Sequence, residues 1–133
     1  MATRVVEHLT VVVTGSRRWR NARAVWSELN KIRLECRQLT LVQGGASGID
    51  HHVRQWAKAA INAGEPVKSI TVIAEWAKYG NAAGPIRNRL MLAKYTPDFL
   101  LAFPGGRGTQ SCIDRAVELG IPIRVIPDQG GMR

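Results

Sequence analysis

The stretch "DFLLAFPGGRGT", residues 98–109, decides the fold because an apolar run passes directly into a glycine-rich turn. Residues 98–103 are almost continuously apolar, which is typical of a strand buried on both faces of a parallel sheet. Three glycines follow within the next five residues, and helical spacing begins at Thr109. The stretch therefore predicts a strand, a tight turn and a helix, with the turn at the carboxyl edge of the sheet.

The same alternation runs along the whole chain. Apolar, β-branched runs predict four further strands, at residues 9–14, 39–43, 69–74 and 121–126. Helical spacing of apolar residues predicts helices at 21–36, 47–63, 85–94 and 109–119, with Asn21 placed to cap the first. This pattern predicts an α/β fold, a Rossmann-like doubly wound parallel sheet of about five strands with helices on both faces. We expect a single domain over residues 1–133, with its core at 9–126 and a loose tail at 127–133.

Composition narrows the class of protein. The 133 residues are 45% hydrophobic and 22% charged, a globular balance, and the net charge is +9. Such a charge favours an anionic partner, although it also serves solubility alone. No run approaches the ~20 apolar residues of a membrane span, and the first residues lack a signal-peptide core, so we expect a cytoplasmic protein without a membrane partner. Cys36 and Cys112 both lie in helical patterns without a CxxC pair, which favours buried thiols in a reducing compartment.

Residues suited to binding phosphate follow each of the first four predicted strands. Glycine lets the backbone approach a ligand, the free N–H groups of a following helix attract anions, and arginine forms forked charge-assisted hydrogen bonds. Because parallel strands end at one edge of the sheet, these residues should line one phosphate site. The predicted ligand-binding residues are Gly15, Ser16, Arg17, Gly44, Gly45, Gly48, Asp50, Arg87, Asn88, Gly105, Gly106, Arg107, Gly108 and Thr109.

Four motifs in this order carry a family resemblance: "GSRRW", "QGGASGID", "AGPIRNRLML" and "FPGGRGT". Together they resemble the SLOG superfamily of Rossmann-like nucleotide-binding domains, over residues 9–126. The resemblance is to its small single-domain members, which are often found in bacteria and their phages. It implies a nucleotide-derived ligand and a homodimer or larger assembly, and nothing in the sequence calls for a cofactor.

Two better-known relatives share parts of the pattern. The Lonely Guy phosphoribohydrolases, often misnamed lysine decarboxylases, carry PGGxGTxxE and release a free base from a nucleoside monophosphate. Gly105, Gly106, Gly108 and Thr109 match that motif, but its glutamate position falls on Cys112. DNA-processing protein A, which binds single-stranded DNA, shares the motif around Gly15 and the SGxAxGID and RN motifs. This second resemblance offers single-stranded DNA as another anionic partner for the basic composition.

Few side chains are candidates for chemistry beyond binding. Asp50 either compensates a helix dipole and holds the glycine loop, or binds a ribose hydroxyl and acts as a general base. Glu75, which ends the predicted third strand, is the reserve catalytic candidate, whereas Asp114 should be solvated. His51 and His52 are adjacent on a predicted helix and point about 100° apart, so we predict no metal site.

The aromatic residues divide by position. The helical positions of Trp26 and Trp56 predict core packing. Trp19, Trp76 and Tyr79 fall in predicted loops at the active edge, where they either stack on a base or pack beneath the loop.

These features predict a domain that binds a nucleotide or nucleotide-derived ligand through phosphate, as a sensor or sequestering protein. Two alternatives stay open. One is an N-glycosidic hydrolase of nucleoside monophosphates, and the other is an accessory protein with weak single-stranded DNA binding.

Overall fold

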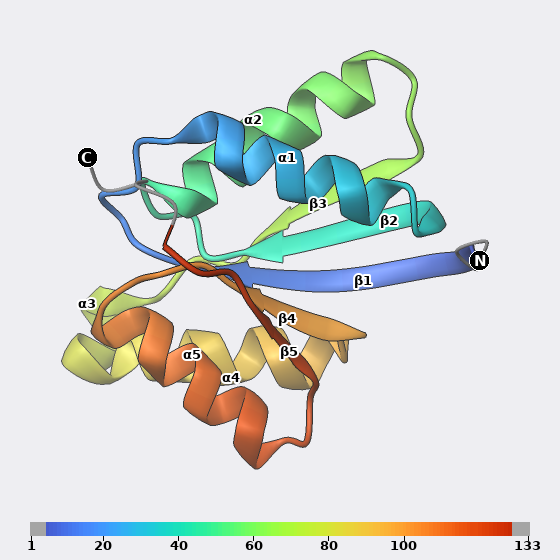
Figure 1. Ribbon diagram of the computed structural model, residues 1–133. Coiled ribbons are helices and arrows are strands. Elements are labelled where there is room, and N and C mark those ends of the chain that lie inside the picture. The colour runs from blue at the N-terminus through green and yellow to red at the C-terminus, as the bar shows by residue number, and fades with distance from the viewer. Residues whose placement is uncertain (1–4, 129–133) are drawn as a thin grey trace.

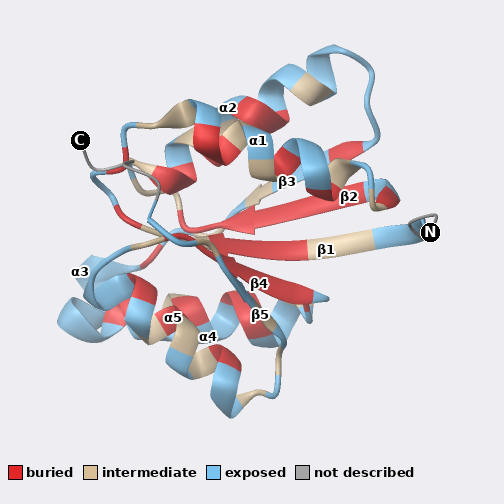
Figure 2. Ribbon diagram, in the orientation of Figure 1, coloured by how far each residue is buried: buried red, intermediate tan, exposed pale blue. Residues whose placement is uncertain are grey.

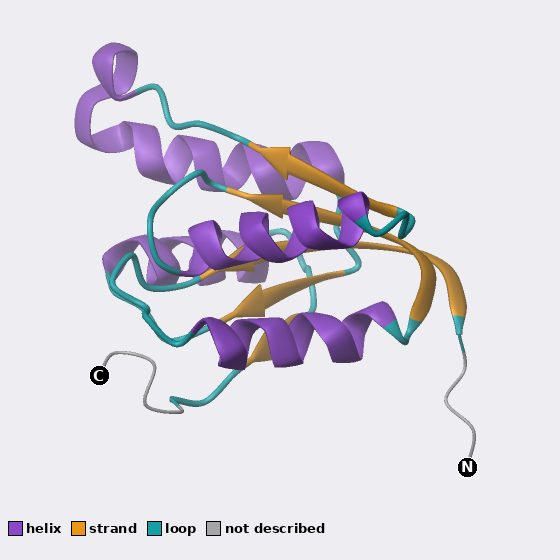
Figure 3. Ribbon diagram, turned by 90° about the horizontal axis from the view of Figure 1, so that it is seen from above, coloured by secondary structure: helices purple, strands orange, loops and turns teal. Residues whose placement is uncertain are grey.

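The computed structural model describes residues 5–128 of the chain. Five strands form one parallel sheet in the order β3-β2-β1-β4-β5, and their arrowheads point the same way in Figure 3. The strands are β1 Val6–Thr14, β2 Cys36–Gln43, β3 Val67–Thr71, β4 Phe99–Ala102 and β5 Ile123–Val125. Residues 129–133 of the predicted loose tail lie outside the described residues.

Helices cover both faces of the sheet (Figure 1). α1 and α2 lie on one face, and α4 and α5 pack together on the other. Their bounds are α1 Ala22–Arg33, α2 Ile49–Asn62, α3 Trp76–Tyr79, the 3-10 helix η1 Gly80–Ala82, α4 Ala83–Tyr95 and α5 Arg107–Glu118. This arrangement confirms the predicted Rossmann-like doubly wound sheet.

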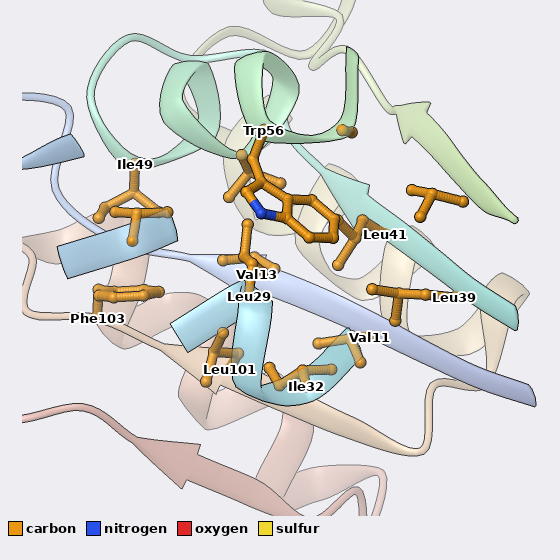
Figure 4. Packing of buried hydrophobic residues seen from close by; sticks show 14 of the residues in the cluster. Val11, Val13, Leu29, Ile32, Leu39, Leu41, Ile49, Trp56, Leu101 and Phe103 are labelled. Atoms are coloured by element: carbon orange, nitrogen blue, oxygen red, sulfur yellow. The ribbon is translucent and has the colours of Figure 1, made fainter. Parts of the chain in front are cut away.

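The sheet separates two apolar clusters, and alternate residues of β1 point into each. Val11 and Val13 belong to the cluster under α1 and α2, together with Trp56, whereas Val12 belongs to the cluster under α4 and α5. Figure 2 shows the buried centre of the sheet, and Figure 4 shows the first cluster from close by. Because both faces are covered, Val11, Val12 and Val13 at the centre of β1 are all apolar, which explains the continuous run in the sequence.

Several boundaries differ from the sequence predictions. The first helix was predicted to reach Cys36, but α1 ends at Arg33 and Cys36 begins β2, where it pairs with Val6. Strand pairing here outweighs a helical pattern that continues past the true end. Cys36 is nevertheless buried, and Asn21 caps α1 as predicted, since its side chain accepts a hydrogen bond from Ala24 N at 3.1 Å.

The fold also contains structure that the sequence did not predict. α3 and η1 occupy a segment that was predicted as a loop, and α4 begins at Ala83 rather than at Pro85. Trp19 is a core residue and is not available to stack on a ligand, since its side chain is 2% exposed. Its indole N–H donates to Asn21 O at 2.8 Å, and its ring meets Phe103 edge-on.

Candidate functional site

A cleft of about 590 Å³ opens where the strand order reverses, at the carboxyl ends of β1 and β4. Ligands of doubly wound sheets bind at such a reversal because the two following helices leave toward opposite faces. The cleft is lined by Thr14, Gly15, Ser16, Arg17, Arg18, Ala46, Asp50, Arg87, Asn88, Pro104, Gly105, Gly106, Arg107, Gly108 and Thr109.

The loop after β1 is fixed by the loops beside it. Ser16 N donates to Pro104 O at 2.9 Å, and Ser16 O accepts from Ile49 N at 3.0 Å. A Cβ on Gly15 would lie 2.5 Å from Ile49 Cγ1 and 2.9 Å from Phe103 Cβ, so glycine is required there for close packing. The chain from Gly15 to Arg17 is therefore held firmly at one wall of the cleft.

The loop after β4 presents a helix N-terminus without a cap. α5 begins at Arg107, two residues before the predicted start, and its N-cap residue is Gly106, which has no side chain to accept a hydrogen bond. Thr109 is therefore not the capping residue; it lies buried in the first turn and lines the cleft. No hydrogen bond among the described residues uses the backbone N–H groups from Gly105 to Thr109. These N–H groups can donate hydrogen bonds to a bound anion.

The other helices that begin near this edge already have a partner for the N–H groups or the positive charge of their N-terminus. Asn21 caps α1, while α2 carries Asp50 in its first turn and gives its first N–H to Ser16 O. α5 has no acidic residue in its first turn. Among the helices that follow β1, β2 and β4, α5 alone keeps a positive N-terminus for a ligand.

Asp50 holds the loop after β2. One carboxylate oxygen accepts from Gly44 N at 3.2 Å and from Ala46 N at 3.1 Å. Burial raises the pKa of this carboxyl, while the two backbone hydrogen bonds and the nearby Arg87 charge oppose the rise. This geometry matches the loop-holding role that the sequence offered as one of two interpretations.

Arg87 and Asn88 connect three loops. Arg87 donates through one terminal nitrogen, Nη1, to Gly44 O at 2.7 Å, and through Nε to Asn88 Oδ1 at 2.9 Å. The Asn88 amide nitrogen donates in turn to Gly108 O at 3.2 Å and lies 3.4 Å from the Ser111 hydroxyl. Burial lowers the pKa of Arg87, with the Asp50 charge opposing. Only Nη2 of Arg87 has no protein partner among the described residues, and that nitrogen can meet a ligand.

Exposed cations surround the cleft. Arg17, Arg18 and Arg107 are exposed, and none of them forms an ion pair within residues 5–128. Three unpaired guanidinium groups beside an open helix N-terminus make the cleft strongly attractive to anions.

The structure does not bring every predicted residue into the cleft. Glu75 is exposed and lines no part of it, and Gly44 and Gly45 line a smaller hollow beside it. Gly48 lines neither space and instead packs against the backbone of Ser16 and Arg17. Thr14, Arg18, Ala46 and Pro104 line the cleft although the sequence did not single them out as ligand-binding. Each is next to a predicted residue, so its position beside that residue in the same loop could have predicted it from the sequence.

Cys112, at the Lonely Guy glutamate position, lies beneath the cleft. Its side chain is fully buried, and burial raises the pKa of its thiol to about 11, against a hydrogen bond with Thr14. The thiol is therefore protonated near neutral pH and is a poor nucleophile.

Within residues 5–128, no group of three or more His, Cys, Asp or Glu side chains is arranged to hold a metal ion. No described helix is both long and apolar enough to cross a bilayer.

Comparisons with known proteins agree with this geometry. The chain matches the YspA, cpYpsA-related SLOG family over residues 9–79. It is 35% identical over 116 residues to the "Gene 61 protein" of Mycobacterium phage D29, covering 85% of this chain and 92% of that protein. Among solved structures it resembles a UDP-N-acetylglucosamine 2-epimerase with a TM-score of 0.52 and 16% identity, over 92% of this chain and 32% of the epimerase.

The sheet order and the cleft at its reversal point define a Rossmann-like α/β protein with an anion-attracting site. The chain belongs to the YspA, cpYpsA-related SLOG family. Membership suggests a nucleotide-related ligand. The matched residues, 9–79, include the loops after β1 and β2 but end before Arg87 and the α5 loop.

Proposed function

We propose that the protein binds a nucleotide or nucleotide-derived ligand, with the ligand phosphate at the N-terminus of α5, and acts as a sensor or sequestering protein. The observation that carries the proposal is the uncapped first turn of α5 opening into the cleft, beside guanidinium groups that no described carboxylate pairs. Backbone N–H groups and arginine are the donors that proteins use to hold phosphate.

The distribution of carboxylates supports binding without turnover. Among the described residues, Asp50 is the only acidic one in the cleft lining, and one of its oxygens already accepts from two backbone N–H groups. N-glycosidic hydrolysis needs a carboxylate free to act as an acid, base or nucleophile. Glu75 lies outside the cleft, and Cys112 is buried and protonated near neutral pH. We therefore favour the sensor over the hydrolase.

Gly106→Asp tests the phosphate site. A Cβ at Gly106 meets nothing within 4 Å, and aspartate is a favoured N-cap residue, so the variant should fold and α5 should be at least as stable. The new carboxylate would occupy the free N–H groups and repel a phosphate. In calorimetric titrations with nucleoside mono-, di- and triphosphates, we expect the parent to bind and Gly106→Asp to lose about 100-fold or more in affinity.

Ser27→Asp is the matched control, because it adds the same charge to an exposed residue of α1 outside the cleft. It should bind as the parent does. Unchanged affinity in a folded Gly106→Asp variant would remove α5 from the site.

A further inference from the structure

A second hollow, of about 200 Å³, adjoins the cleft. Arg17, Ala46 and Arg87 line both spaces, so a ligand in the cleft has direct access to the hollow. The remaining wall comes from the loops after β2 and β3 and from the start of α3: Gly44, Gly45, Ser47, Ile73, Ala74 and Trp76.

Large apolar side chains are exposed at this hollow. Trp76 is 49% exposed and Ile73 is 66% exposed, although both sit on an ordered wall. One edge of the indole lies over Gly84, since a Cβ there would lie 3.3 Å from the ring. Gly45 has a φ of +78°, and a Cβ there would lie 2.7 Å from Ile73 Cδ1. Glycine at both positions leaves room for this apolar wall.

Arg17 connects the hollow to the cleft electrostatically. Its guanidinium carbon lies 6.0 Å from the centre of the Trp76 ring, at the outer limit of a cation–π contact. The same side chain lines the predicted phosphate cleft. A ligand that extends from the cleft into the hollow would therefore displace this exposed cation from the Trp76 ring to reach the aromatic face.

The hollow also offers backbone groups for hydrogen bonding. Pairing with β2 ends where Val72 N donates to Gln43 O, and no hydrogen bond among the described residues uses the backbone of Ile73 or Ala74. The lining contains no acidic residue. An aromatic face beside free backbone donors and acceptors suits a planar group with apolar faces and polar edges.

We infer that this hollow binds the nucleobase, stacked on Trp76, of a ligand whose phosphate lies at α5. The inference rests on the proposed function and deepens it. It assigns the ligand to nucleotides with an aromatic base, rather than to sugar phosphates or inorganic polyphosphate.

Tryptophan fluorescence tests the stacking directly. The four ribonucleoside 5′-monophosphates and ribose 5-phosphate are the probes, with affinity also measured by calorimetry. We expect at least one nucleotide to quench fluorescence and to bind about tenfold or more tighter than ribose 5-phosphate. Trp76→Phe should keep most of that affinity but lose the quenching, and Trp76→Ala should lose about tenfold for the nucleotide and nothing for ribose 5-phosphate.

Trp26→Phe is the matched control. The buried indole N–H of Trp26 has no hydrogen-bond partner, so this variant loses no hydrogen bond and should keep the quenching.

The outcomes separate this inference from the proposed function. Equal affinities for nucleotide and ribose 5-phosphate, unchanged in Trp76→Ala but lost in Gly106→Asp, would overturn the base site and leave the phosphate site standing. Quenching that disappears in Trp76→Phe but persists in Gly106→Asp would support the base site and overturn the phosphate site. No binding of either probe would overturn both.

Discussion

At the scale of single residues, the site separates groups that hold the loops from groups left free for a ligand. Asp50 and Asn88 use their polar atoms for hydrogen bonds within the protein, to neighbouring backbone and, for Asn88, also to the Arg87 side chain. Arg17 and Arg107 are exposed and form no ion pair within the described chain. Residue type alone did not separate these roles, because an aspartate beside glycines fits both. The hydrogen-bond partners, which depend on the fold, decide between them.

Replacement of Asp50 should distinguish loop holding from ligand chemistry. Asp50→Asn keeps an oxygen that accepts from Gly44 N and Ala46 N, so its free energy of unfolding should stay within about 1 kcal/mol of the parent. Asp50→Ala leaves both N–H groups without their acceptor and should cost about 2 kcal/mol or more. Urea unfolding measures both changes.

The raised pKa of Asp50 also predicts that the stability of the protein depends on pH. Burial raises the folded-state pKa of Asp50, so the folded protein holds that proton more tightly than the unfolded chain. Its contribution to stability is therefore fully present below the unfolded pKa and is lost as the pH rises through the folded pKa. Compared with Asp50→Asn, the parent should gain stability as the pH falls from about 8 to about 4. A constant difference across this range would contradict the raised pKa.

At the scale of elements, the sequence predicted which segments form helices and strands better than where each begins. Asn21 correctly predicted the start of α1 because a side-chain cap is a local signal in the sequence. The start of α5 at Arg107 carries no such signal, since its N-cap is a glycine. The sequence therefore predicts a start at Thr109, two residues too late. Cys36 was placed in a helix because pairing with Val6, a distant residue, is invisible in a helical pattern.

Asn88 joins α4 to the first turn of α5, and Asn88→Ala should loosen that junction. The side chain is 3% exposed and connects Arg87 Nε with Gly108 O. Its loss should cost about 1–3 kcal/mol in the free energy of unfolding and should speed hydrogen exchange at residues 108–111. Asn81→Ala, at an exposed residue of η1, is the control and should change stability by less than about 0.5 kcal/mol. Equal effects of the two substitutions would remove Asn88 from this role.

At the scale of the molecule, the predicted α/β alternation was sufficient to predict which loops line the cleft. Parallel strands bring their following loops to one edge whatever the local loop geometry, so the glycines after β1 and β4 meet as expected. The hollow beside Trp76 was not predictable in the same way. It depends on α3, a helix of four residues, and on the packing of Trp76 against Gly84, both of which are set by tertiary contacts.

The distribution of the net charge of +9 over the molecule determines how the protein should bind DNA. Described carboxylates pair with arginines away from the cleft, as in Arg124–Glu35 and Arg33–Glu65. Arg17, Arg18 and Arg20 are exposed and, like Arg107, form no ion pair within residues 5–128. Single-stranded DNA contacts should therefore be made to this group, with few phosphates neutralised. We predict weak binding near physiological salt.

Salt titration distinguishes DNA on this surface from a nucleotide in the cleft. Affinity for single-stranded DNA falls with salt with a log–log slope of about −0.7 per neutralised phosphate. We expect a measurable slope for an oligonucleotide, made shallower when Arg17, Arg18 and Arg20 are replaced together by glutamine and unchanged in Gly106→Asp. A nucleoside monophosphate should show a shallower slope, saturate at one per chain and lose its binding in Gly106→Asp. Fluorescence anisotropy with a labelled oligonucleotide measures the first, and calorimetry the second. Tight oligonucleotide binding at physiological salt that Gly106→Asp abolishes would place DNA in the cleft itself and make DNA-processing protein A the better guide to function.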